Sequence, residues 1–424
     1  MRRRDFLGYA AAGSAWAALT GCAGIEARAA GRVVVVGGGY GGATVAKYLR
    51  MWSNGGVAVT LVEPGAEFVS CPLSNLVVGG SRQLADVTIG YAGLDRRWGV
   101  TLVRDTAVAV DADRRTVRLA GGTTLPYDRL ILSPGIELLY DQLPSLGSAA
   151  ARARVLHAWK AGPQTVALRR QLEAMPDGGV YAISIPVAPY RCPPGPYERA
   201  CQVAWYFKRA KPRAKVLVLD GNPDITSKAG LFRKAWAEEY KGIVEYRNHH
   251  VLTDVDVATL TAKFETADDV RADVLNVVPP QRAADIARDA GVITANGRWC
   301  EVDFLTYESV KVRNVHVLGD AIQGAPAMPK SGHMANQHAK VCAAAVLALL
   351  AGETPNPAPM VTNTCYSFIT DRDAVHVASV HHYDRDRRTM VAVPGAGGLS
   401  PALTAAEGGY AFAWAQNIWA DTLA

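Results

Sequence analysis

Seven cysteines are spread along the 424-residue chain, too few for a disulfide scaffold but enough for a small set of reactive thiols. Cys192 lies among prolines directly before a predicted helix, where the helix dipole favours a thiolate. Cys71 lies in a loop after a predicted strand, and Cys365 lies far along the chain in a polar segment. The sequence alone does not pair them, and it leaves other cysteines as competitors: Cys201, Cys300 and Cys342.

Gly37, Gly39 and Gly42 form a second group of residues suited to chemistry, because they have the G-x-G-x-x-G spacing. In such a loop the first glycine allows a tight turn, the second lets the backbone approach a pyrophosphate, and the third lets helix and strand pack closely. The β-branched run 32–36 before them is typical of a buried parallel strand, and a helical pattern starts at Ala43. The N-terminus of that helix would face the phosphates.

The next predicted strand ends in Glu63, where an acidic side chain can bind ribose hydroxyls. Strand, loop, helix and acid in register predict a dinucleotide site, although the motif does not distinguish FAD from NAD. Segment 127–135 looks like the strand and turn that close the FAD domain in two-dinucleotide flavoproteins, and 314–321 looks like their late strand ending in Gly-Asp. Asp320 is then the candidate for the ribityl and pyrophosphate region, and a helix over 331–350 would point its N-terminus at the flavin.

A second strand–helix–strand unit covers about residues 179–220, but its loop is unsuited to a phosphate. The loop 186–196 is rich in proline, which adds ring bulk and supplies no backbone N–H. We therefore predict a second Rossmann-like domain that has lost nicotinamide binding, so that electrons enter or leave by another route. The chain shows no metal-ligand spacing among its cysteines and no C-x-x-C-H motif, so we expect no c-type haem on the chain itself.

Composition sets the broad class. Hydrophobic residues make up 49% and charged residues 20%, as in an ordinary globular protein, and a net charge of +6 is too mild to argue for nucleic acid. We predict an α/β fold with two Rossmann-like dinucleotide-binding domains plus an α+β C-terminal interface domain. Residues 31–160 and 285–352 would form the FAD-binding domain, 161–284 the second Rossmann-like domain, and 353–424 the domain that faces the flavin and a partner.

Residues 1–30 resemble an export signal, with a basic start followed by an apolar stretch. Arg2 and Arg3 resemble a twin-arginine signal, a route that carries folded proteins. Cleavage near Ala29 and lipidation of Cys22 are both compatible with the sequence, and a buried N-terminal helix is a further alternative. With either cleavage or lipidation, we expect a periplasmic protein, in an oxidising compartment where disulfides persist. We expect no other segment to be long and apolar enough for a membrane span.

Several segments together resemble one family, the flavoprotein subunit of flavocytochrome c sulfide dehydrogenase. The likeness runs from about residue 31 to the C-terminus, and its most specific segment is 191–200, Arg-Cys-Pro-Pro-Gly-Pro-Tyr-Glu-Arg-Ala. The other matching segments are 33–39, 71–75, 157–162, 278–282, 328–332, 363–367 and 414–418. The resemblance implies a glutathione-reductase-like flavoprotein that binds FAD, oxidises sulfide and passes electrons to a c-type cytochrome subunit.

The resemblance also implies roles for single residues. Cys71 matches a cysteine that binds the FAD 8α-carbon covalently, although its own surroundings favour a buried, inert thiol. Cys192 and Cys365 match a redox-active disulfide beside the flavin. Glu198 matches an active-site glutamate with an acid–base role, and a helix N-terminal carboxylate stabilised by the dipole explains it equally well. Lys330, in one of the matching segments, is expected to bind the cofactor.

In the implied reaction, hydrosulfide attacks one sulfur of the disulfide and leaves a persulfide on one cysteine and a thiolate on the other. Two departures from the family stand out. Ile322 replaces a cysteine after Gly-Asp-Ala, so no disulfide is expected there, and the stretch 371–397 is poorly matched. Two other functions remain open: a sulfide:quinone reductase, which resembles this fold and disulfide, and an accessory flavoprotein of a thiosulfate-oxidising system.

Overall fold

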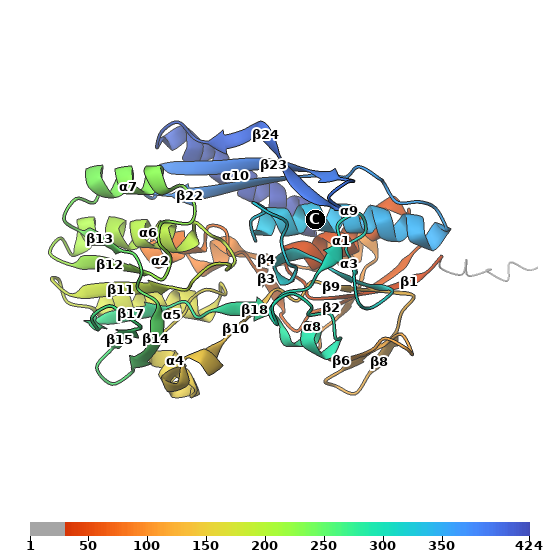
Figure 1. The fold of residues 1–424 in the computed structure, drawn as a ribbon, viewed down its shortest axis with the longest axis horizontal. Coiled ribbons are helices and arrows are strands. Elements are labelled where there is room, and N and C mark those ends of the chain that lie inside the picture. Colours follow the sequence, from red (N-terminus) through yellow and green to blue (C-terminus); the bar gives the residue numbers. More distant parts are fainter. Residues whose placement is uncertain (1–29) are drawn as a thin grey trace, which may run out of the picture.

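The computed structural model describes residues 30–424. The twin-arginine signal, the cleavage near Ala29 and the lipidation of Cys22 therefore lie outside the described residues. The described chain is built around two sheets with parallel cores, and a third, antiparallel sheet lies across both of them (Figure 1).

The first sheet has seven strands and carries the glycine loop. Its strand β1 (Arg32–Val36) contains four valines that are almost wholly buried, which explains why this run is apolar throughout. β1 pairs in parallel with β2 (Ala58–Val62) on one side and with β9 (Arg129–Leu132) on the other. The order is β19-β20-β21-β9-β1-β2-β5, and the remaining strands are β5 (Thr101–Val103), β19 (Val302–Asp303), β20 (Glu308–Ser309) and β21 (Val315–Val317).

Two long helices pack against each other beside this sheet (Figure 1). α1 (Tyr40–Trp52) begins directly after the glycine loop, earlier than its apolar pattern suggested. α9 (Gly332–Ala351) begins after Ser331, whose hydroxyl accepts the backbone N–H of Met334 as a helix cap. α9 has the length and hydropathy of a membrane span, so the expectation that no such segment follows the N-terminus is wrong. Half of its apolar stretch is buried against other elements, as in the core helix of a globular protein.

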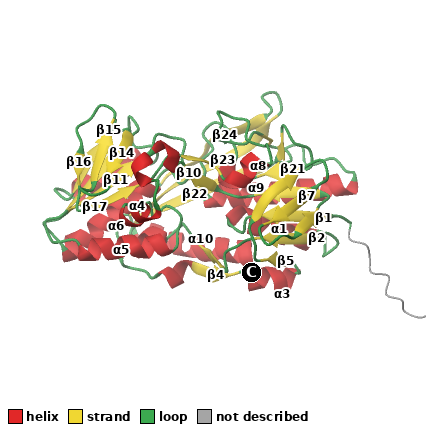
Figure 2. Ribbon diagram, turned by 90° about the horizontal axis from the view of Figure 1, so that it is seen from below, coloured by secondary structure: helices red, strands yellow, loops and turns green. Residues whose placement is uncertain are grey.

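The second sheet has the order β13-β12-β11-β17 and is parallel throughout. Its strands are β11 (Val180–Ile185), β12 (Lys215–Asp220), β13 (Val244–Arg247) and β17 (Val274–Val277). The helix after the proline-rich loop is α6 (Gly195–Ala210), one of three helices around this sheet together with α5 (Pro163–Ala174) and α7 (Ala229–Glu238) (Figures 1 and 2). The predicted strand–loop–helix–strand order of this unit is therefore present.

The C-terminal residues form an antiparallel sheet and a last helix. The strands are β22 (Met360–Phe368), β23 (Ala374–Asp384) and β24 (Thr389–Leu399), and the helix is α10 (Ala405–Leu423). β22 contacts α9 and also α6, so this sheet joins the two parallel sheets (Figure 1). The stretch 371–397, poorly matched to the family, is the β23–β24 hairpin.

Short elements complete the chain. A two-stranded ribbon of β10 (Ile136–Leu138) and β18 (Gln281–Ala283) lies where the chain passes between the two parallel sheets (Figure 1). The other strands are β3 (Glu67–Val69), β4 (Thr88–Gly90), β6 (Ala107–Asp111), β7 (Thr116–Leu119), β8 (Thr124–Pro126), β14 (Leu252–Asp256), β15 (Thr261–Phe264) and β16 (Val270–Arg271). The other helices are α2 (Ser74–Gly79), α3 (Ala92–Trp98), α4 (Ala149–Arg154), α8 (Asp285–Asp289) and the 3₁₀ turns Leu84–Val87, Tyr140–Gln142, Pro144–Leu146 and Gly319–Ala321. The predicted α/β fold class is confirmed.

Candidate active site

The glycine loop has the geometry of a phosphate cradle. A side-chain Cβ at Gly42 would lie 1.8 Å from the carbonyl oxygen of Gly37, so helix and strand approach here as only glycine permits. Gly37 itself has φ +98°, a conformation that favours glycine. Gly39 lies just before α1, and a Cβ there would meet no atom within 4 Å. The open space before the helix N-terminus fits the pyrophosphate of a dinucleotide.

Glu63 lies beside this loop at the end of β2. Its two carboxylate oxygens each accept a backbone N–H, from Gly38 and from Gly65, both at 2.7 Å. The hydroxyl of Tyr91 donates to the Gly38 carbonyl at 3.0 Å and closes the loop on the same side. Glu63 is therefore held at the edge of the cradle, in the position predicted for a ribose ligand.

Asp320 follows strand β21 and its side chain is directed into the protein. Among residues 30–424 its Oδ1 is buried and has no hydrogen-bond partner. Burial raises the pKa of Asp320, and the nearby charges of Arg191 and Lys330 oppose that rise. A buried carboxylate oxygen without a donor fits a polar ligand such as the ribityl chain of FAD.

Lys330 contributes to this region in a different way from the one predicted. Its Nζ donates to the backbone carbonyls of Asp320, at 3.1 Å, and Ile322, and it lies 3.7 Å from the centre of the Trp299 ring. Its own carbonyl accepts the N–H of Cys192 at 2.8 Å. Lys330 thus ties the Gly-Asp turn to the loop that carries the reactive cysteine.

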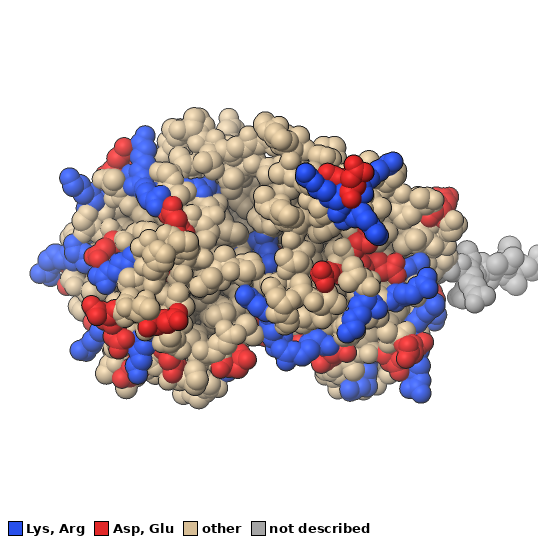
Figure 3. Space-filling model, viewed as in Figure 1, with Lys and Arg blue, Asp and Glu red and all other residues tan. Residues whose placement is uncertain are grey.

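One cavity lies where the first sheet, α6, α9 and the C-terminal elements meet. It encloses about 830 Å³, including space open to solvent. Its lining contains Tyr40 and Asp320 from the dinucleotide side and Ala411 and Trp414 from α10. The predicted site residues that it brings together are Cys71, Cys192, Glu198, Asp320, Lys330 and Cys365. On the face drawn in Figure 3, Lys and Arg side chains are interspersed with Asp and Glu side chains, and the upper part of that face carries few charges.

Cys192 packs against the first turn of α6. It adopts φ +55°, and its carbonyl accepts the Gly195 N–H at 2.9 Å. A Cβ at Gly195 would lie 2.9 Å from the Cys192 sulfur, so the glycine of the motif makes room for the thiol. Burial raises the pKa of Cys192, and the nearby Cys365 and Glu198 raise it further.

Cys365 lies on β22 and reaches the same cavity. Its sulfur lies 3.6 Å from the amide nitrogen of Asn363, and the Ser331 hydroxyl donates to the oxygen of that amide at 2.6 Å. Both Cys365 and Cys192 are free thiols in the structure, so their disulfide stays a prediction.

Cys71 lines the cavity beside an arginine. The Nη2 atom of Arg191 lies 3.0 Å from the Cys71 sulfur, and Arg191 also donates to the carbonyl of Trp159. Cys71 is thus partly exposed at the cavity and in contact with a buried guanidinium, unlike the buried cysteines of the core.

Glu198 satisfies both explanations given for it. It lies in the first turn of α6 and also lines the cavity. One carboxylate oxygen accepts the N–H of Phe368 at 2.9 Å, and the other accepts the side-chain amide of Asn75 at 2.9 Å. Burial raises the pKa of Glu198, and its two hydrogen bonds and the charges of Lys228 and Arg199 oppose that rise.

Arg199, the next residue, fixes α6 to a different part of the protein. Its guanidinium donates to the side-chain oxygens of Asn75, at 3.1 Å, and Asn276, at 3.0 Å. It also donates to the carbonyls of His157, at 3.0 Å, and Ala158, at 2.6 Å. The Glu-Arg pair of the motif therefore positions the helix that presents Cys192.

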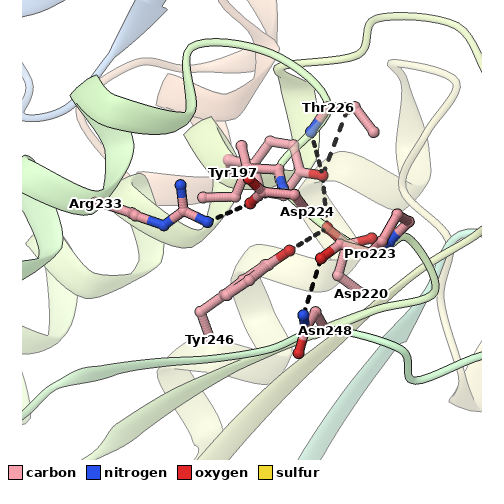
Figure 4. Close-up of polar contacts among 9 residues, drawn as sticks. Tyr197, Asp220, Pro223, Asp224, Thr226, Arg233, Tyr246 and Asn248 are labelled. Atoms are coloured by element: carbon pink, nitrogen blue, oxygen red, sulfur yellow. Dashed lines mark hydrogen bonds and ion pairs between the residues drawn. The ribbon is translucent and has the colours of Figure 1, made fainter.

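Tyr197 fixes the opposite side of α6 at the end of the second sheet (Figure 4). Its hydroxyl donates to Asp220 at 2.6 Å, and the Tyr246 hydroxyl donates to the same carboxylate at 3.1 Å. The backbone N–H of Thr226 reaches the Tyr197 oxygen at 3.2 Å. In a dinucleotide fold the acid at this strand end binds ribose. Here Asp220 is buried and bonded to tyrosines of the protein itself.

Three functional residues were not singled out from the sequence. Arg191 and Asn75 lie in matching segments, next to Cys192 and shortly after Cys71, but nothing in their spacing shows what they contact. Lys228 gives no sequence signal, and it reaches β22 from a loop more than a hundred residues away in the sequence. These contacts depend on how the sheets pack together.

Comparisons with known proteins agree with this geometry. Residues 165–279 match the family model "Sulfide dehydrogenase [flavocytochrome c] flavoprotein chain, central", and residues 357–423 match "Flavocytochrome c sulphide dehydrogenase, flavin-binding". Residues 31–158 match the model for pyridine nucleotide-disulphide oxidoreductases.

Individual relatives point the same way. A flavoprotein chain of flavocytochrome c sulfide dehydrogenase from Chlorobaculum thiosulfatiphilum is 63% identical over 46 residues, which is 11% of this chain and 94% of that sequence. Mitochondrial sulfide:quinone oxidoreductase from Dictyostelium discoideum is 26% identical over 300 residues, 68% of this chain and 65% of that protein's length.

Among solved structures, the sulfide:quinone oxidoreductase of Aquifex aeolicus has the same fold. It superimposes with a TM-score of 0.76 at 17% identity, over 92% of this chain and 91% of that one. Two matched sulfide dehydrogenase models, the flavoprotein relatives and a cysteine-lined cavity beside a dinucleotide cradle lead to one conclusion. The chain belongs to the family of flavoproteins that comprises the sulfide dehydrogenases and the sulfide:quinone oxidoreductases.

Proposed function

We propose that the protein oxidises sulfide to sulfane sulfur at the Cys192–Cys365 pair and passes the electrons through FAD to a c-type cytochrome subunit. The observation that carries the proposal is the single cavity that Cys71, Cys192 and Cys365 line next to the dinucleotide cradle. Thiol–disulfide exchange needs an accessible sulfur. All three of these cysteines are partly exposed, whereas the other cysteines of the described residues are buried: Cys201, Cys300 and Cys342.

The residues that would hold FAD are Gly37, Gly39 and Gly42 at the pyrophosphate, Glu63 at the ribose and Asp320 at the ribityl chain. FAD, when bound, supplies an acceptor for two electrons that it can release one at a time. Lys330 fixes the turn that carries Asp320, so it acts through that residue.

A haem acceptor fits this chain better than a nicotinamide. At the ends of β11 and β12, Asp220 accepts Tyr197 and Tyr246 on one oxygen (Figure 4) and two N–H groups of Asn222 on the other. Proline supplies no N–H to a phosphate, and Asp220, with two donors on each oxygen, has no free lone pair for a ribose. Electrons must therefore leave by another route, for which a one-electron protein acceptor is suited.

Sulfide-dependent reduction of a c-type cytochrome tests this function. We expect the purified full-length protein to reduce the cytochrome when sulfide is present and not when NADH replaces it. The relatives that act on quinone make the matched assay with a soluble quinone the necessary comparison. Faster quinone reduction, with no reduction of the cytochrome, would assign the acceptor to quinone instead.

We also propose that FAD is bound covalently through Cys71, with Arg191 holding the reactive thiolate. The support for this is the 3.0 Å contact between Arg191 Nη2 and the Cys71 sulfur. Burial acts to lower the pKa of Arg191, but the nearby Cys71, Asp320 and Cys192 raise it, so the guanidinium stays charged beside the Cys71 sulfur.

Arg191→Gln is expected to lower the fraction of protein that carries covalent FAD at least about tenfold, because glutamine removes the charge that favours the thiolate. The mass of the denatured protein measures this fraction directly. Arg191→Lys should retain part of it, and Arg233→Gln, which removes an exposed arginine paired with Asp224, should retain all of it. An unchanged covalent fraction in Arg191→Gln would contradict the role of Arg191, and loss of the adduct in Cys71→Ser identifies the bonded residue.

We further propose that the protein works in the periplasm after twin-arginine export. The basis is the arginine pair and apolar stretch of residues 1–30. A twin-lysine substitution of Arg2 and Arg3 that leaves export intact would contradict the route.

A further inference from the structure

Lys228 is a buried lysine that bonds the backbone of Cys365, and it has no part in the function proposed above. Its side chain is 4% exposed, and it precedes α7 with φ +59°. The Nζ atom donates to the carbonyl of Cys365 at 2.7 Å and to the hydroxyl of Ser367 at 2.8 Å. The lysine thus joins α7 to the part of β22 that carries the reactive cysteine.

This arrangement is unfavourable unless a negative charge is near. A left-handed backbone is unfavourable for a lysine, and a buried ammonium needs a partner of opposite charge. The two bonded oxygens are both neutral. Burial lowers the pKa of Lys228 to about 8, so the charge is retained at neutral pH.

The groups that face Lys228 come from four elements. They are Cys365 on β22, Glu198 on α6, Cys192 in the loop before α6, and Glu407 on α10, and each favours the charged lysine when it is itself ionised. Glu407 is already bonded to His376 at 2.6 Å, and Glu198 to Phe368 and Asn75. Lys228 bonds the carbonyl of Cys365 itself, and its bond to Ser367, two residues along β22, places the ammonium on the face of the strand that carries the Cys365 side chain.

The two cysteines are not equivalent. Burial raises the pKa of Cys365, but Lys228 and the hydrogen-bond donors around its sulfur lower it. For Cys192, burial, Cys365 and Glu198 raise the pKa and Arg191 lowers it, with no hydrogen-bond donor to the sulfur among the causes; Glu198 also raises the pKa of Cys365. The amide of Asn363 also faces the Cys365 sulfur, at 3.6 Å, and Ser331 fixes that amide. The surroundings therefore favour a negative charge on Cys365 over one on Cys192.

We infer that Lys228 stabilises the Cys365 thiolate, so that hydrosulfide attacks Cys192 and Cys365 leaves. Lys228 is then a positioning residue that determines which cysteine is attacked and which one leaves. The inference rests on the disulfide reaction proposed above. A bond forms between the sulfide sulfur and Cys192 while the Cys192–Cys365 bond breaks. The electron pair of the broken bond stays on Cys365, the proton stays on the terminal sulfur, and the single negative charge is conserved. The better leaving thiolate sets the sulfur that is attacked.

The unmodified protein provides the first test. After reduction, iodoacetamide is added over a range of pH, and peptide mass spectrometry reports the alkylation of each cysteine. We expect the midpoint of Cys365 to lie at lower pH than that of Cys192. In a second arm, oxidised protein receives sulfide for a single turnover and is then alkylated, and the added sulfur should be found on the Cys192 peptide. Finding it on the Cys365 peptide would overturn the inference.

Substitution of the lysine provides the second test. Lys228→Met should move the Cys365 midpoint upward by about 1 to 3 pH units and erase the difference between the cysteines, whereas Lys228→Arg should retain it. Lys208→Met, which removes a partly exposed lysine of α6 paired with Glu239, is the matched control. A Cys365 midpoint unmoved in Lys228→Met would overturn the role of the lysine.

The sulfide reaction and the role of Lys228 can be disproved separately. If sulfide leaves no added sulfur on either cysteine of the unmodified protein, the proposed sulfide reaction is wrong. If the added sulfur is found on Cys365 and the Cys365 midpoint does not move in Lys228→Met, the sulfide reaction stands and the inference about Lys228 is wrong.

Discussion

Cys192→Ser is expected to lower sulfide-dependent turnover by on the order of a thousandfold or more, with FAD content unchanged. A serine oxygen cannot take part in sulfur exchange, so the variant loses the disulfide that accepts the sulfide electrons. The backbone bonds of residue 192 to Lys330 and Gly195 do not involve the sulfur and persist in the variant. Turnover is measured with sulfide and a c-type cytochrome, and FAD content from the flavin-to-protein ratio.

Cys201→Ala is the matched control, because Cys201 lies on the same helix but does not line the cavity. Its sulfur contacts only the Trp236 indole among side-chain donors in the described chain, at 3.3 Å, so turnover should stay within about twofold of the unmodified protein. Full sulfide-dependent turnover in Cys192→Ser would contradict the proposed redox role of Cys192 and Cys365. Full loss in both variants would instead indicate a general effect on α6.

Gly39→Ala is expected to weaken FAD binding at least about tenfold while leaving the fold of the apoprotein intact, a loss of about 1.4 kcal/mol or more. The backbone at Gly39 has φ −69°, which alanine adopts freely, and the added Cβ meets no protein atom within 4 Å. The methyl group would occupy the space through which the pyrophosphate approaches the backbone. Flavin titration of apoprotein measures the affinity, and thermal unfolding of the same apoprotein measures the fold.

Substitutions of two other glycines are the controls for this result. Gly230→Ala, in α7, also meets no atom within 4 Å but lies away from the cradle, so its FAD affinity should match that of the unmodified protein. Gly42→Ala should destabilise the apoprotein itself, because its Cβ would lie 1.8 Å from the Gly37 carbonyl. Normal FAD affinity in Gly39→Ala would mean that the cradle does not hold the pyrophosphate.

The local parts of the site could be predicted from the sequence because they are short-range. The strand, glycine turn and helix around Gly37 to Gly42 are one continuous segment, so periodicity and spacing describe them fully. The same holds for Glu63, which ends the next strand. The prediction that the second Rossmann-like unit lacks a phosphate cradle likewise rests on the prolines of 186–196, since proline acts through its own backbone.

The charges around the sulfur atoms could not be predicted, because they arrive from distant elements. Arg191 reaches Cys71 across the interface of the two parallel sheets, and Lys228 reaches Cys365 from the start of α7. The spacing and periodicity of residues in a sequence do not show which buried cation contacts which cysteine. The apolar character of α9 was misjudged for a similar reason, because the helix is half covered by neighbours that a sequence window does not contain. The cofactor role of Lys330 stays a prediction, and its bonds to backbone carbonyls were not visible in the sequence.

The packing of α10 on α1 affects how the protein must be made. The last helix bonds to the first at Lys47 Nζ, which meets the Ala420 carbonyl at 2.9 Å, and at Tyr48, whose hydroxyl meets Asp421 at 2.5 Å. The same helix supplies Trp414 to the wall of the cavity. The site is therefore incomplete until residues 405–423 have been synthesised and have packed on α1. A protein that lacks α10 would hold a cofactor in a cavity open on one side.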